Sequence, residues 1–400
     1  EKEMNFAVVA PQSSHWEDSH RAAAILVKAL RRIGHEAWLV TSVYHDGEPA
    51  VDPEVVEKSE EGFVELERDV SGVPTIRVLS ARSMLPPGAV ALRSFSKILA
   101  AVDRRRGVDA VVVFSSFWNG PEEAAKWVTI KKMLAQSGEA EKPPALVYVP
   151  VYPTGAHGAS PVEAVSRSIW STLNLPQVLR QAAAVVVSCR EEAEAIRQFR
   201  VPADRVIEGK WWIDPDYPEA LAAAGRPPLL EGFELVVSYA GPLTEEKNVR
   251  ALVKLAERMP QAAVAVVGRG DAAAWLRREA ARRRNLVVVE DPSAVASVAR
   301  GSLLGVDLSL HEPMGIRALE YLYAGTPYAA SPTSRAACHI TDGVDGARLR
   351  NPEDLDGVAS LVSTLVKKPE LREEMGRHGR RKTENLLATR LAEALVARLR

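Results

Sequence analysis

Two carboxylates eight positions apart, Glu312 and Glu320, stand on either side of Gly315 in the segment HEPMGIRALE. A carboxylate can hold a sugar hydroxyl and offset the positive charge that develops on a sugar as its bond to a leaving group breaks. The backbone amides around Met314, Gly315 and Ile316 would open a helix, and such amides attract an anion such as a diphosphate. An acid at the reacting end, an anion seat in the middle and a second acid for a sugar hydroxyl together indicate a nucleotide-sugar site.

The elements predicted around these acids place them at the edge of a sheet. The apolar run 303–310 is typical of a buried parallel strand, and 316–323 has the pattern of a helix start. Glu312 then lies on the turn after the carboxyl end of a strand, where open α/β sheets bind ligands. The plain alternative is a helix-start acid that only complements the helix dipole.

Four segments in the second half of the chain occur in the order of one known family. They are HEPMGIRALE at 311–320 with AGTP at 324–327, GPLTEEKN at 241–248, VAVVGRGD at 264–271 and DGVDG at 342–346. In this order they resemble the retaining GT-B glycosyltransferases of family four, also called group one. The resemblance implies an α/β protein with the GT-B fold, in which two Rossmann-like domains with parallel sheets face each other across a cleft. It also implies transfer of a hexosyl group from a nucleotide-diphosphate sugar to an acceptor hydroxyl, with retention and without a metal or other cofactor.

The same resemblance gives expected roles to single residues. Glu312 would lie beside the donor sugar, Lys247 would offset the charge of the departing diphosphate, and His157 would contact the donor sugar. An exposed lysine at a helix start and an unrelated loop histidine are the plain alternatives for the last two. The positions expected to bind the nucleotide sugar are Glu320, Gly315, Met314, Ile316, Gly241, Gly268, Arg269, Arg317 and Glu290.

The phosphate-binding pattern departs from the family at one position. Pro242 stands where the family has an arginine, so half of its cationic clamp is missing. Arg269 or Arg317 would have to replace it from a neighbouring turn, and Arg317 is preferred because it lies beside the expected diphosphate seat.

The acceptor side depends on loops of the first half of the chain. The first loop, 11–18, lacks the family's usual Gly-Gly pair. His15, Trp16 and Trp118 fall in predicted loops and are expected to bind the acceptor, because sugar rings stack well on indole faces.

Short β-rich runs alternate with amphipathic stretches, which predicts parallel sheets with helices on both faces. The segment 216–231 has three prolines and a glycine and is expected to link two domains. The acceptor domain would then be 1–215 and the nucleotide-sugar domain 232–382, and a helix at 383–400 would cross back as such tails do in the family. The predicted strands are 5–10, 36–41, 109–115, 145–150, 183–188, 235–239, 263–267, 286–289, 305–310 and 328–330.

Composition argues against several classes of protein. The 400 residues carry a formal charge of −1, which gives no overall attraction to nucleic acid. No apolar run approaches the roughly 20 residues of a membrane span, and no signal peptide is apparent, so we expect a cytoplasmic protein. Cys189 and Cys338 are the only cysteines and 8 scattered histidines show no metal-ligand spacing. The basic run 104–106 is either a solvated helix end or a weak contact for an anionic membrane.

The amide side chains are scarce and the charged ones abundant. There are 7 Asn and 6 Gln beside 51 Lys plus Arg and 52 Asp plus Glu. This bias indicates a thermophilic source, and a GC-rich genome accounts for it equally well.

Three other functions remain open from the sequence. A nucleotide-sugar epimerase would use the same fold and donor without an acceptor. A catalytically inactive protein that binds or senses a nucleotide sugar is favoured by Pro242, the missing Gly-Gly pair and Thr333-Ser334, where the family usually has glycine. It is opposed by the presence of Glu312, Lys247 and Glu320. A periplasmic-type binding protein would share the architecture.

Overall fold

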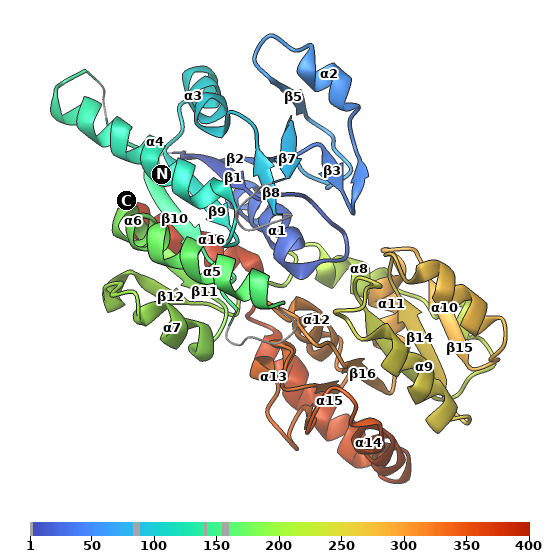
Figure 1. The fold of residues 1–400 in the computed structure, drawn as a ribbon. Coiled ribbons are helices and arrows are strands. Elements are labelled where there is room, and N and C mark those ends of the chain that lie inside the picture. The colour runs from blue at the N-terminus through green and yellow to red at the C-terminus, as the bar shows by residue number, and fades with distance from the viewer. Residues whose placement is uncertain (1–2, 83–88, 140–141, 154–159) are drawn as a thin grey trace. The chain divides into compact units, whose positions relative to one another are not determined.

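The computed structural model describes residues 3–82, 89–139, 142–153 and 160–400. The chain forms two compact units, each built on its own parallel sheet (Figure 1). The first unit contains Glu1–His15, Ser19–Trp211 and Ala388–Arg400, and the second contains Trp16–Asp18 and Trp212–Leu387. The predicted α/β class with parallel sheets is confirmed.

The first unit has an 8-stranded sheet in the order β12-β11-β10-β9-β1-β2-β6-β5. All its neighbours are parallel except β5, which runs antiparallel to β6. Continuous valine- and alanine-rich runs form its central strands because both of their faces are buried. The strands are β1 Asn5–Val9, β2 Glu36–Ser42, β5 Phe63–Leu66, β6 Thr75–Val78, β9 Ala110–Phe114, β10 Ala145–Val149, β11 Ala182–Val187 and β12 Val206–Glu208, with short pairs β3 Tyr44–His45, β4 Glu48–Pro49, β7 Ser80–Arg82 and β8 Val90–Leu92.

Helices follow most strands of the first unit and supply its core. One face of the sheet packs with residues of α3, α4, α6 and α7 in a single hydrophobic cluster. The last helix of the chain, α16, packs on β11 of this unit. The helices are α1 Asp18–Arg32, α2 Pro53–Glu57, α3 Phe95–Arg106, α4 Asn119–Gln136, α5 Pro161–Leu173, α6 Leu175–Gln181, α7 Arg190–Arg197, the 3-10 turn η1 Ala203–Arg205 and α16 Ala388–Leu399.

The second unit has a 6-stranded, wholly parallel sheet in the order β15-β14-β13-β16-β17-β18. Counted from its first strand, this is the order 3-2-1-4-5-6 of a doubly wound dinucleotide-type fold. The strands are β13 Val236–Ala240, β14 Ala263–Val267, β15 Leu286–Val289, β16 Leu304–Asp307, β17 Tyr328–Ala330 and β18 Gly346–Arg348.

Alternate residues of these strands feed two separate cores. Val237 and Val264 join the cluster that contains α9 and α14, whereas Val236 and Ala263 join the cluster that contains α11 and α12. The sheet is therefore covered on both faces, as the alternation of elements predicts. The helices are α8 Tyr217–Ala223, the 3-10 turn η2 Pro228–Leu230, α9 Val249–Arg258, α10 Ala273–Ala280, α11 Ala294–Gly301, α12 Ile316–Tyr323, α13 Ala336–His339, α14 Leu355–Lys367 and α15 Pro369–Thr383.

Two segments differ from the sequence-based expectation. The expected linker, 216–231, contains α8 and η2 and belongs to the second unit, where Tyr217 and Leu230 are buried. Its prolines start these turns rather than prevent them, because proline is well tolerated in the first turn of a helix. The strand expected up to residue 310 ends at Asp307, and the three residues after it turn toward the site described next.

Candidate functional site

The switch point of the second sheet lies between β13 and β16. These strands are neighbours, and the chain leaves their carboxyl ends toward opposite faces of the sheet, since α9 follows β13 and α12 follows β16. Ligands of doubly wound folds bind at this place. The loops after the two strands, 241–248 and 308–315, carry Lys247 and Glu312.

Backbone contacts fix the two loops against each other. The amide of Leu310 donates to the carbonyl of Glu246 at 2.8 Å, and the side-chain amide of Asn248 donates to the carbonyl of Leu308 at 3.1 Å. Asn248 has a left-handed backbone with φ 52°, a conformation that asparagine tolerates better than most residues. The turn it makes starts α9 and leaves Lys247 facing the second loop.

Lys247 is a buried cation held by two carboxylates. Its Nζ lies 2.7 Å from Oε2 of Glu312 and 3.5 Å from Oε2 of Glu17, and it donates to the carbonyl of His311 at 3.0 Å. Its side chain is 2% exposed. Burial lowers the pKa of Lys247, but the charges of Glu17 and Glu312 outweigh burial and hold the pKa well above its ordinary value. Lys247 is therefore a permanent positive charge in a site from which water is largely excluded.

Glu312 links this cation to the start of α12. Its Oε1 accepts hydrogen bonds from the amides of Met314 at 2.9 Å and Gly315 at 3.1 Å, while Oε2 faces Lys247. Burial raises the pKa of Glu312, but the Lys247 charge and these hydrogen bonds outweigh it and lower the pKa below its ordinary value. The amides expected to be open to a diphosphate are thus engaged by the protein's own carboxylate. A diphosphate could bind these amides only if Glu312 releases them.

The backbone at this helix start requires a glycine. Gly315 has φ +71°, and a Cβ at this position would lie 2.5 Å from the amide nitrogen of Ala336. The neighbouring residues Met314 and Ile316 are buried, and Nε2 of His339 lies 2.8 Å from the carbonyl oxygen of Met314. We conclude that these three residues shape the turn, and that only their backbone atoms are placed to meet a ligand.

Glu320 finds a cationic partner within its own helix. Oε2 of Glu320 accepts a hydrogen bond from Nη1 of Arg317 at 2.8 Å, and the two side chains are 1% and 9% exposed. A buried carboxylate needs such a partner or a polar ligand. Arg317 lines a small pocket of about 10 Å³ together with Glu312 and Gly315, so Glu320 is connected to the same site through Arg317.

The Gly-Arg-Gly turn after β14 is explained first by packing. A Cβ on Gly268 would lie 1.9 Å from the carbonyl oxygen of Gly241, and one on Gly270 would lie 2.5 Å from that of Leu243. These glycines let the loops after β13 and β14 touch through their backbones. The side chain of Arg269 between them is exposed, and Glu290 at the end of β15 forms an ion pair with Arg277.

Replacing Gly268 with alanine is expected to destabilise the second unit by about 1–3 kcal/mol or more, because one backbone must move away from the other. Hydrogen exchange of the β13 and β14 amides of the variant measures this loss in the second unit. Gly301→Ala is the matched control, since a Cβ there meets nothing within 4 Å. Equal stability of the two variants would contradict the packing explanation.

Several residues of the site escaped the sequence-based prediction. Asp307 ends β16, is 5% exposed and accepts hydrogen bonds from the Ser334 hydroxyl at 2.6 Å and the Ser309 amide at 2.9 Å. Burial raises the pKa of Asp307, and the charge of Glu312 raises it further. The hydroxyl of Tyr239 donates to the carbonyl of Pro242 at 2.8 Å. Asp307 could have been predicted as a site residue, because it is an acid inside an apolar run. No local feature of the sequence indicated that Tyr239 belongs to the site.

Two acceptor-side expectations are changed by burial. Trp16 and Trp118 are only 2% and 3% exposed, so neither indole offers a stacking face to a sugar here, which corrects that prediction. The Trp118 indole donates to the carbonyls of Phe114 and Ser115, and Trp16 joins the α11–α12 core. The amide of His15 donates to Asp46 at 3.1 Å, while His157 lies outside the described residues.

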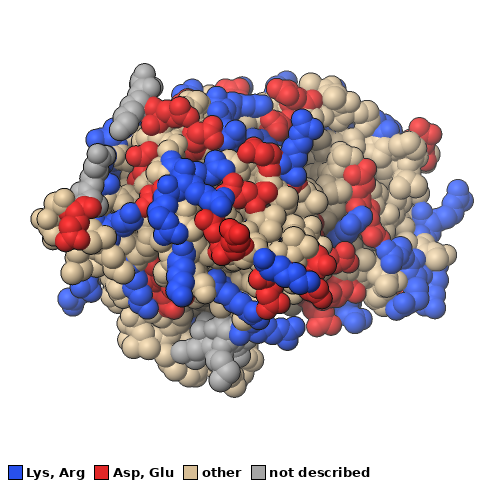
Figure 2. All heavy atoms as spheres, turned by 90° about the horizontal axis from the view of Figure 1, so that it is seen from above, with Lys and Arg blue, Asp and Glu red and all other residues tan. Residues whose placement is uncertain are grey.

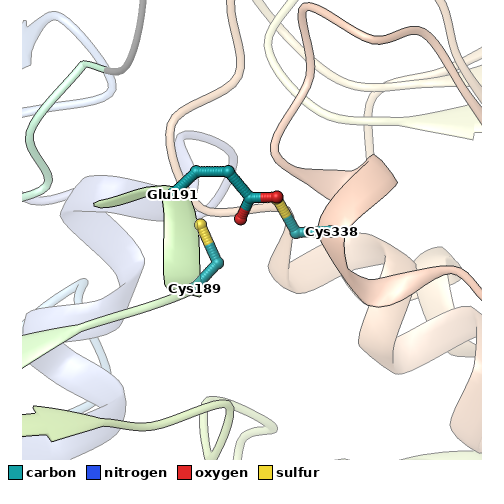
Figure 3. A group of neighbouring side chains, drawn as sticks. All are labelled: Cys189, Glu191 and Cys338. Carbon is teal, nitrogen blue, oxygen red and sulfur yellow. The ribbon is translucent and has the colours of Figure 1, made fainter. Parts of the chain in front are cut away.

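The cysteines lie at two helices, one in each unit (Figure 3). Cys189 is buried at the start of α7, with Glu191 in the first turn of that helix. Cys338 is half-buried in α13. Cys189 belongs to the first unit and Cys338 to the second.

Surface charge is mixed on the face shown in Figure 2, where basic and acidic side chains are interspersed. This distribution accords with the formal charge of −1. Among the described residues, no helix combines the length and the apolar character that a membrane crossing needs.

The segment that contains Lys247 and Glu312 matches a family model. Residues 226–382 match the family model described as glycosyl transferases group 1. A segment of 175 residues is 29% identical to the GDP-mannose-dependent alpha-(1-6)-phosphatidylinositol dimannoside mannosyltransferase of Mycobacterium tuberculosis, covering 42% of this chain and 44% of that protein. A segment of 168 residues is 27% identical to glycogen synthase of the same organism, covering 40% of each chain. The match thus spans less than half of either curated relative.

Solved structures match over almost the whole chain. Sucrose-phosphate synthase of Thermosynechococcus elongatus superimposes with a TM-score of 0.67 at 17% identity, covering 99% of both chains. HepE of Anabaena, solved in complex with UDP-glucose, gives a TM-score of 0.65 at 13% identity, again covering 99% of both. At such low identity these likenesses establish the fold alone. The chain therefore has the GT-B glycosyltransferase fold, and its residues 226–382 carry the sequence pattern of glycosyl transferases group 1.

Proposed function

We propose that the protein transfers a hexosyl group from a nucleotide-diphosphate sugar to an acceptor hydroxyl, with retention of anomeric configuration and without a metal ion. The observation that carries the proposal is the 2.7 Å contact between Lys247 and Glu312 at the switch point of a sheet whose residues match the group 1 model. A permanent cation and a carboxylate at this place match what a departing diphosphate and a reacting sugar each need.

Each charged residue then has one task. Lys247 offsets the negative charge that grows on the diphosphate as the sugar leaves, which is the help a metal ion would otherwise give. The amides of Met314 and Gly315 bind the same diphosphate once Glu312 releases them. Glu312, turned away from these amides, holds a hydroxyl of the donor sugar and offsets its developing positive charge. Glu320 and Arg317 together hold the nucleotide ribose.

The first unit supplies the acceptor side in this proposal. His15 and His157 remain candidates for contacts to the acceptor and the donor sugar. The base of the donor is either guanine or uracil in this proposal. One relative is named as GDP-mannose-dependent, and a structural neighbour was solved with UDP-glucose.

A thermal-shift screen against UDP-, GDP- and ADP-sugars tests the donor site. A ligand at one hundred times its Kd is expected to stabilise the protein by about 2.7 kcal/mol, so a shift that grows with concentration identifies the base. Transfer to small sugar acceptors, followed by NMR of the anomeric proton, tests retention, and equal rates with and without EDTA test independence from metal. No shift with any nucleotide sugar would contradict the proposal.

Replacing Glu312 with glutamine is expected to lower kcat about 10²–10³-fold, because a neutral amide cannot offset the charge on the sugar. Binding of the nucleotide alone should change much less, since Lys247 remains. Steady-state kinetics together with calorimetric titration of the nucleotide separate the two effects. Glu374→Gln, an exposed glutamate on α15, is the matched control. A kcat within twofold of wild type would remove Glu312 from the reacting centre.

A catalytically inactive protein that binds a nucleotide sugar is the second candidate. It is favoured by the carboxylates that already engage the start of α12 and by Pro242 in place of the family arginine. A nucleotide-sugar shift without transfer, hydrolysis or epimerisation would select this function. Epimerisation of the donor without an acceptor would select an epimerase.

A further inference from the structure

The segment Trp16–Asp18, hereafter the acidic tripeptide, belongs to the second unit although it lies near the amino terminus. Trp16 is 2% exposed and packs in the hydrophobic cluster that contains residues of α11 and α12. A buried indole of this size fixes the position of the two acids that follow it. The acidic tripeptide is therefore seated in the second unit by its own apolar side chain.

Asp18 engages the start of α12. Its Oδ2 accepts a hydrogen bond from the amide of Arg317 at 3.2 Å, and the residue is 2% exposed. The amides of Met314 and Gly315 already donate to Glu312. Three amides at this helix start are thus held by carboxylate oxygens, which are the chemical counterparts of phosphate oxygens at such a place.

Glu17 reaches the cation of the site. Its Oε2 lies 3.5 Å from Nζ of Lys247. Burial raises the pKa of Glu17 to about 7, with the Lys247 charge acting against this shift and the Glu312 charge adding to it. The two acids of the tripeptide thus contact Lys247 and an amide at the start of α12, next to the Met314 and Gly315 amides that the proposed function assigns to the diphosphate.

Little room remains between these groups. The pocket lined by Trp16, Asp18, Glu312, Gly315 and Arg317 has a cavity volume of about 10 Å³. Pockets that hold ligands of nucleotide-sugar size are larger, roughly 300–1,000 Å³. A diphosphate could not enter while the acidic tripeptide stays in place.

We propose that the acidic tripeptide is an internal competitor of the donor diphosphate: Glu17 and Asp18 occupy its seat, and the donor must displace them to bind. The inference rests on the proposed function, because it concerns the same diphosphate seat. Only molecules in which the diphosphate seat is open can bind the donor. The apparent Kd for the donor is therefore the intrinsic Kd divided by the fraction of open molecules. The donor site is then closed until a nucleotide sugar, or an event that withdraws the tripeptide, opens it.

Removing the two charges tests the competition. The full chain carrying Glu17→Gln and Asp18→Asn is titrated calorimetrically with inorganic pyrophosphate and with UDP, beside the wild type. Since one hydrogen bond to a charged group contributes about 1.5–3 kcal/mol, we expect both ligands to bind at least roughly tenfold tighter to the variant. The matched control removes two exposed acids, Glu353→Gln and Asp356→Asn, and is expected to bind like the wild type because it changes net charge equally.

Two results would overturn the inference. One rejects only the competition, and the other also rejects the diphosphate seat of the proposed function. Unchanged or weaker binding by the variant, with clear binding by the wild type, rejects the competition but keeps the diphosphate seat. Binding of neither ligand to either protein rejects the seat and the competition together. Thermal unfolding checks that the variant is folded, and Asp18→Ser, which keeps a good helix-start residue, replaces Asp18→Asn if it is not.

Discussion

Replacing Lys247 with methionine is expected to lower the free energy of unfolding of the second unit by about 3–5 kcal/mol, because a buried carboxylate loses its partner. Glu312 is 8% exposed, and without the cation 2.7 Å away it must either stay buried without an opposite charge or take up a proton, and both cost stability. Methionine fills the aliphatic space of the lysine, so the loss reports the charge rather than a cavity. Hydrogen exchange of the β13 and β16 amides locates the effect in the second unit, which a single global unfolding curve of a two-unit protein cannot do.

Two further variants test whether the loss comes from an unpaired buried charge. The control Lys254→Met breaks an exposed ion pair with Glu353, at 3.0 Å with both side chains more than half exposed, and should cost at most about 1 kcal/mol. Adding Glu312→Gln to Lys247→Met should recover part of the stability, since Glu312 was the nearer of the two carboxylates left without the cation. A Lys247 variant as stable as the control would mean that the cluster is more hydrated than its burial indicates.

Replacing Arg77 with methionine is expected to destabilise the first unit by a similar amount, about 3–5 kcal/mol. Arg77 and Asp69 are 0% and 1% exposed, and the guanidinium donates to Asp69 through Nε at 3.1 Å and Nη2 at 2.6 Å. Nη1 also donates to the carbonyls of Ser42 and Tyr44 at 2.8 and 3.1 Å. One side chain therefore joins the end of β2 to the segment before β6. Protection of the β2 and β6 amides against hydrogen exchange measures the loss.

The pH dependence of this variant has a definite sign. Burial raises the pKa of Asp69, but the hydrogen bonds and charge of Arg77 outweigh it and leave the pKa below its ordinary value. A carboxyl whose folded pKa is lowered stabilises the protein above its unfolded pKa and loses this contribution as pH falls through the folded value. The gap between wild type and Arg77→Met should therefore be widest near neutral pH and shrink below about pH 4. The exposed pair Lys58–Glu54 supplies the control, Lys58→Met, whose loss should stay below about 1 kcal/mol at every pH.

Predicting the sheets from the sequence was reliable where both faces of a strand are buried. Strands such as β9 and β14 are continuous apolar runs, and a run of this kind between turn residues leaves few alternatives to a buried strand. The region around β5 and β6 was not predicted, because its strands are short and its order depends on Arg77, whose partner Asp69 is eight residues away. Polar pairs of this kind leave no periodic signal.

At 216–231 the sequence predicted a linker where the structure has packed helical turns. Prolines and a glycine at 216–231 suggested a chain break, yet α8 packs on α11 and Leu230 is buried in the second unit. Proline marks the start of a helix as readily as a boundary between domains, so composition alone could not distinguish the two. Only the packing of Tyr217 and Leu230 decides which one applies.

Most elements of the second unit and the turn that carries Glu312 could be predicted from the sequence alone, since strand runs and a helix-start glycine are local properties. The roles of Lys247 and Glu320 stay predictions that rest on the family resemblance. Tertiary structure decided which partner each charge takes. Lys247 meets Glu312 because β13 and β16 are neighbours, although 65 residues separate them, and Asp18 meets the Arg317 amide across 299 residues. Burial makes these long-range pairings obligatory, because a charge removed from water must find an opposite charge or a hydrogen-bond donor, and no local pattern records which one is near.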